Sequence, residues 1–163
     1  MTPRILFGLG LLLAVGGPVT AVLQKEHLLR SGRTVLLELA PRDPRSLLQG
    51  DYMALDYALA RTLQALPGLP RDGHAVLRDD PRGVAVFVRL HGGAPLGPGE
   101  YLLRFRSRGL RPRLGTESFF FQEGQGPHFQ PARFGELRVD ARGTALLAGL
   151  RDADLKPLGP TRR

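Results

Sequence analysis

The sequence GDYMALDYALARTLQAL, residues 50–66, changes from a strand pattern to a helix pattern within one segment. In an extended segment, alternation places Met53, Leu55 and Tyr57 on one face. From Ala58 to Leu66 the leucines recur at helical intervals instead, and the Pro-Gly pair that follows ends the helix. This segment therefore predicts a fold that contains strands and one short helix.

The chain beyond this segment carries further strand patterns, separated by glycine and proline. Short runs of β-branched, aromatic and other apolar residues predict strands at 34–39, 74–77, 84–90, 101–107, 116–121, 135–140 and 145–150. Residues 124–134 are expected to form a loop with a helical turn. Successive short strands with turns between them predict a mainly β (α+β) fold, with an antiparallel sheet, a sandwich or a small barrel carrying one short helix.

An apolar segment of nineteen uncharged residues, Ile5–Leu23, precedes the strand-rich part. As a helix it would reach about 28 Å, close to the roughly 30 Å hydrocarbon core of a bilayer, which predicts a transmembrane helix. A cleaved signal peptide is the alternative, with breakers at residues 16–18 and small residues at 19–21 as the cleavage site. We prefer the uncleaved anchor because the apolar run continues to Leu23. Both interpretations place the rest of the chain outside the cytoplasm.

These patterns divide the chain into four parts. Residues 1–24 are the membrane anchor or signal peptide, 25–33 a linker of partly helical composition, 34–156 one β-rich domain, and 157–163 a polar tail. A hydrophobic content of 42% is sufficient for one core. The chain has no cysteine, which excludes disulfides and thiolate metal sites.

The net charge of +8 comes mainly from arginines scattered along the chain. One cluster departs from this scatter: Arg104, Arg106 and Arg108 alternate with Leu103 and Phe105, so a strand would place these arginines on one face as a basic ridge. Arg111 and Arg113 follow this cluster. Near anionic lipid headgroups each basic residue contributes about 1 kcal/mol. The alternative is an ordinary solvated strand face. Nucleic-acid binding is disfavoured, because no aromatic-rich reading motif accompanies the basic residues.

The eight residues Gly50-Asp51-Tyr52-Met53-Ala54-Leu55-Asp56-Tyr57 match a family signature letter for letter. The chain resembles the bacterial GDYXXLXY family, and residues 119–126 and 132–139 resemble a later segment of the same family. The resemblance implies a single-pass anchor in the inner membrane, a β-rich domain in the periplasm, and association with polytopic membrane proteins. It brings no catalytic residues with it. We expect the signature positions to be structural: Gly50, Asp51, Tyr52, Leu55 and Tyr57.

Motifs for catalysis are weak in this sequence. Ser46 precedes Gly50-Asp51 as the nucleophile does in membrane serine peptidases of the signal peptidase type, but the spacing is too short. A serine–lysine dyad also needs a desolvated lysine, and the chain has only Lys25 and Lys156. Carboxylates that might pair across strands as acid and base are Asp51, Asp56, Glu117, Glu123 and Glu136. Binding the many arginines is the commoner role for such carboxylates.

Metal-site spacing is also missing from the histidine positions. His27, His74, His91 and His128 form no H-x-x-x-H or H-E-x-x-H pair, so we expect neither a metal nor a cofactor. Two functional classes remain. The preferred one is a non-catalytic accessory or interaction module for a membrane partner or lipid headgroups, since it needs only an anchor, a basic ridge and a compact β domain. The alternative is an envelope hydrolase that uses a carboxylate pair or Ser46.

Overall fold

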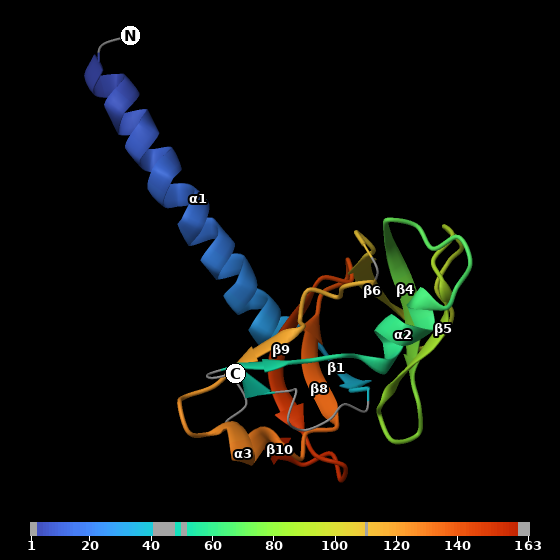
Figure 1. Cartoon of the computed structure of the whole chain (residues 1–163). Helices are drawn as coiled ribbons and strands as arrows, with labels where there is room; N and C mark the ends of the chain where they lie inside the picture. The colour runs from blue at the N-terminus through green and yellow to red at the C-terminus, as the bar shows by residue number, and fades with distance from the viewer. Residues whose placement is uncertain (1–2, 41–47, 50–51, 110, 160–163) are drawn as a thin grey trace.

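A computed structural model describes residues 3–40, 48–49, 52–109 and 111–159 of the chain. Its helices are α1 (Pro3–Ser31), α2 (Ala58–Gln64) and α3 (Gly126–Phe129). Its strands are β1 (Arg33–Glu38), β2 (Leu48–Gln49), β3 (Tyr52–Ala54), β4 (Asp72–Asp79), β5 (Ala85–Leu90), β6 (Tyr101–Arg106), β7 (Ser118–Phe120), β8 (Phe134–Val139), β9 (Ala145–Arg151) and β10 (Pro157–Leu158). The long helix α1 projects away from a body in which the strands are gathered (Figure 1).

Helix α1 runs without a break for 29 residues, through Pro18 and into the segment assigned to the linker. The helical composition noted from residue 24 onward is realised as its last turns, and Ser31 Oγ donates to the carbonyl of His27 at 2.8 Å. Leu28 is buried where these turns reach the body. In the described part of the chain, no helix combines the length and the apolar character needed to cross a bilayer. That finding does not support the transmembrane assignment of residues 1–24.

The strands of the described residues pair antiparallel in three sheets, which confirms the mainly β, antiparallel fold. Their orders are β1-β8-β9-β10, β2-β3-β7 and β5-β4-β6. The first sheet joins distant parts of the chain, since Arg33 lies opposite Val139 and Glu38 opposite Phe134. Residues 140–144 form the tip of the β8–β9 hairpin, so this tip lies at the end of the sheet where α1 enters β1.

One hydrophobic core unites the three sheets and α2. Leu37 of β1, Leu77 of β4 and Leu103 of β6 are at most 2% exposed, and Leu63 of α2 is fully buried. Burying such side chains stabilises each by roughly 1.5–3 kcal/mol relative to exposure. Helix α2 lies in the segment predicted to be helical, and the leucines whose spacing predicted it, Leu59 and Leu63, are on the face that it buries.

Two segments of the body also differ from the sequence-based expectation. The strand expected to run to Tyr57 ends at Ala54, and Tyr57 then forms only an isolated bridge with Leu39. Residues 157–158, predicted to begin a polar tail, form β10 and pair with β9. A tight turn explains this return, because Asp152 Oδ1 accepts the backbone N–H groups of residues 154 and 156, each at 2.9 Å.

Candidate functional site

The signature segment lies in the core as far as the structure describes it. Gly50 and Asp51 are outside the described residues, while Met53, Leu55 and Tyr57 are buried, as the alternation predicted. The Tyr57 hydroxyl donates to the backbone carbonyl of Thr116 at 3.0 Å. Burial raises the pKa of Tyr57, so this side chain stays neutral in the folded protein.

The Tyr57 ring also fixes the contact with the four-stranded sheet. A Cβ added to Gly135 of β8 would lie 3.0 Å from Tyr57 Cε1 and 3.1 Å from its hydroxyl oxygen. Glycine at position 135 therefore lets the ring lie against the strand. The remaining signature residue, Tyr52, is half-buried, and its ring lies 5.8 Å from that of Phe120 on β7.

The arginines of the predicted basic ridge line a groove on the body. Arg104 and Arg106 are exposed on β6 while Leu103 and Phe105 are fully buried, which confirms the alternation. Arg108 lies beyond the end of the strand yet lines the same groove. The groove measures about 510 Å³ and is completed by Arg113, whose backbone pairs with that of Arg106 at 2.7 and 2.8 Å. We call this feature the arginine groove.

The charges of the arginine groove are only partly compensated. Arg106 and Arg108 each lie 3.7 Å from the carboxylate of Asp72. Glu117, also in the groove, accepts the backbone N–H groups of residues 114 and 115. Within the described part of the chain, neither Arg104 nor Arg113 forms an ion pair. The groove therefore offers guanidinium groups to an anion, and guanidinium binds phosphate or carboxylate in a bidentate manner.

Two of the carboxylates considered for catalysis bind arginines of the chain. Asp56 Oδ2 lies 3.1 Å from Arg61 and 3.3 Å from Arg111. The side chain of Glu136, 4% exposed, binds Arg151 Nε at 2.8 Å. Both have the arginine-binding role that the sequence analysis favoured.

Among the described residues, the other candidate catalytic and metal-binding side chains form no cluster. Glu123 is exposed, and Ser46 lies outside the described residues, so the serine hypothesis stays a prediction. The described residues hold no group of three His, Cys, Asp or Glu side chains placed to bind a metal ion. The rings of His74 and His91 lie side by side, with centroids 6.4 Å apart and no third ligand among the described residues.

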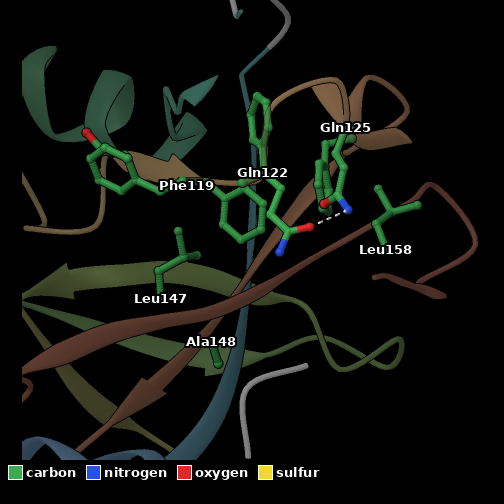
Figure 2. A pocket seen from close by; sticks show the side chains of 10 residues that line it. Phe119, Gln122, Gln125, Leu147, Ala148 and Leu158 are labelled. Atoms are coloured by element: carbon green, nitrogen blue, oxygen red, sulfur yellow. Dashed lines mark hydrogen bonds between the residues drawn. The ribbon is translucent and has the colours of Figure 1, made fainter. Parts of the chain in front are cut away.

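An apolar cleft that the sequence analysis did not predict lies beside β7. It measures about 460 Å³, and Figure 2 shows Phe119 and Gln122 above Leu147 and Ala148 of β9. Phe129 of α3 also lines the cleft, and its ring centroid is 4.9 Å from that of Phe119. No ionisable side chain is among the described residues that line it. The sequence feature that could have indicated this cleft is the run of three phenylalanines at 119–121, which belongs to the segment that resembles the family.

Comparison with known proteins identifies a family for the chain. The family model described as GDYXXLXY protein matches residues 14–150, which is most of the chain. No curated protein matches, and neither does any solved structure.

Proposed function

The chain belongs to the GDYXXLXY family, and we propose that it is a non-catalytic module, anchored by α1 in the inner membrane, whose arginine groove binds the phosphate groups of anionic lipids. Its β-rich body would lie in the periplasm. The observation that carries the proposal is the arginine groove itself, where Arg104 and Arg113 have no acidic partner among the described residues.

The membrane anchor is supported by the sequence and exposure of α1. Residues 5–23 carry no charge, and the apolar side chains described on this helix, such as Leu12, Val15 and Val22, are exposed where it projects from the body (Figure 1). Leaving apolar surface in water costs roughly 25 cal/mol per Å², which insertion into lipid would recover.

The position of the groove relative to α1 supports the choice of lipid. The hairpin tip at 140–144 lies at the α1 end of its sheet, and the carbonyl of Gly143 in this tip accepts the N–H of Arg104 at 2.8 Å. Thr144 of the tip lines the arginine groove. An anchored body would therefore hold at least the Arg104 end of the groove near the bilayer. Basic residues near an anionic surface contribute about 1 kcal/mol each.

A structural role for the signature completes the proposal. Leu55 and Tyr57 are buried, and the Tyr57 hydroxyl donates to a backbone carbonyl, that of Thr116. Asp56 and Glu136 bind arginines, which supports a module over a hydrolase. We therefore assign the signature to the architecture of the body and the contact with the membrane to the arginine groove.

Hydrogen exchange of the full chain in nanodiscs tests this assignment. We expect slower amide exchange across residues 104–115 in phosphatidylglycerol nanodiscs than in phosphatidylcholine nanodiscs, with the difference disappearing at high salt. Arg104→Gln combined with Arg113→Gln should abolish the difference. Arg133→Gln is the matched control, because Arg133 is exposed, forms no ion pair with another described residue, and lies just before β8, at the end away from α1.

Equal exchange in the two kinds of nanodisc would contradict the lipid role. Protection seen in native membranes but absent from phosphatidylglycerol nanodiscs would point instead to an acidic loop of a polytopic membrane protein.

A further inference from the structure

A second groove lies where α1 meets the body. It is formed between the last turns of α1 and the tip of the β8–β9 hairpin, and it measures about 890 Å³. Ala21, Lys25 and Leu28 all line it, and their spacing of four and three residues places them on one face of the helix. We call it the helix–hairpin groove. Residues of the helix and residues of the body both line this groove.

Positive charge in this groove is incompletely neutralised. Arg33 binds Asp79 at 2.8 Å, and its guanidinium lies over the Tyr101 ring. The carboxylate of Asp140 accepts two backbone N–H groups of the hairpin tip, both at 2.8 Å. Lys25 on the helix and Arg142 on the hairpin form no ion pair with any residue that the structure describes. Lys25 and Arg142 therefore line opposite walls of the groove without an acidic partner in the described ranges.

The groove also changes in polarity along α1. Its apolar end begins at Ala21, beside the exposed side chains of Val22 and Leu23, which end the uncharged run. If that run lies in a bilayer, Lys25 stands about 3 Å beyond its end at ~1.5 Å per residue, which is the level of the headgroups. A lysine at this depth extends its ammonium group toward the interface. The groove would thus open at the boundary between acyl chains and headgroups.

We propose that the helix–hairpin groove binds one anionic phospholipid, with its phosphate between Lys25 and Arg142 and its acyl chains along α1. This inference rests on the proposed function, since lipid reaches the groove only if α1 lies in the membrane. Arginine binds the phosphate through a bidentate fork and lysine as a point charge. Phosphatidylcholine carries a cationic choline beside its phosphate, so phosphatidylglycerol should bind more tightly.

Native mass spectrometry of the full chain in detergent, with either lipid added, tests the site. We expect the wild-type chain to retain one phosphatidylglycerol in preference to phosphatidylcholine. Each lost charge should weaken binding about fivefold, so Lys25→Gln combined with Arg142→Gln should weaken it about 25-fold. Both side chains are exposed, and circular dichroism should show the fold unchanged. Arg133→Gln, one charge at the other end of the sheet, should bind like wild type.

The outcomes separate this site from the proposed function. A double variant that retains phosphatidylglycerol as wild type does overturns the inference, as does equal retention of the two lipids by a chain that partitions into membranes. Arg104→Gln combined with Arg113→Gln should still retain the single lipid, because those residues line the other groove. A wild-type chain recovered from the soluble fraction would overturn the anchor and this site together.

Discussion

Replacing Tyr57 by phenylalanine isolates one hydrogen bond of the signature. Tyr57 is 1% exposed, and its hydroxyl donates to the carbonyl of Thr116 across 59 residues of chain. The bond ties the end of the signature to the segment that leads into β7. Phenylalanine keeps the ring against Gly135 and removes only the hydroxyl, so little cavity is created.

The expected loss of stability follows from the Thr116 carbonyl, which loses its hydrogen-bond donor in this variant. An unsatisfied buried carbonyl costs about 1–3 kcal/mol, and we expect a loss near the middle of that range, about 2 kcal/mol. For a body of this size each kcal/mol shifts the melting temperature by roughly 3–5 °C. Tyr57→Phe should therefore lower the melting temperature by roughly 6–10 °C.

Thermal and urea unfolding of the purified full chain, followed by circular dichroism, measures this loss. Phe120→Leu is the control, since Phe120 is an exposed aromatic residue whose replacement should change stability by less than about 0.5 kcal/mol. If Tyr57→Phe unfolds at the same temperature and urea concentration as wild type, the bond does not hold the signature in place.

Two further predictions concern the backbone and the pH dependence of stability. Gly143→Ala should destabilise the body more than Gly115→Ala. Both glycines have positive φ, but only at Gly143 would the new Cβ lie 2.9 Å from a backbone nitrogen, that of Arg104, so equal melting temperatures of the two variants would contradict this prediction. Burial raises the pKa of Tyr57 and Tyr101, and at Tyr101 the bond to Asp79 adds to the effect, so the unfolded chain loses these protons first as pH rises. The contribution of Tyr57 to stability should be constant below about pH 10 and fall above it by about 1.4 kcal/mol per pH unit, and Tyr101 should add a smaller fall in the same direction. A urea midpoint that stays constant above about pH 10 would refute the assignment.

Local patterns in the sequence predicted local structure well. The leucine spacing after Tyr57 identified α2, and the alternation around Phe105 identified the buried and exposed faces of β6. Both features depend on residues a few positions apart, whose side-chain directions are fixed by helix or strand geometry.

Pairings between distant segments could not be read in the same way. Nothing local to Arg33 indicates that it lies opposite Val139, and the return of residues 157–158 to β9 depends on a turn set by Asp152. The candidate sites show the same limit. The ridge was visible as an alternation and Arg113 as an arginine that follows it, but the backbone pairing with Arg106 that brings Arg113 into the groove is not encoded locally.

Carbonate extraction of membranes from cells that produce the full chain, with intact-mass measurement of the recovered protein, tests the anchor most directly. We predict that the uncleaved chain stays in the membrane pellet and that a chain lacking residues 1–24 is released. Recovery of the intact full-length chain in the soluble fraction would contradict the account.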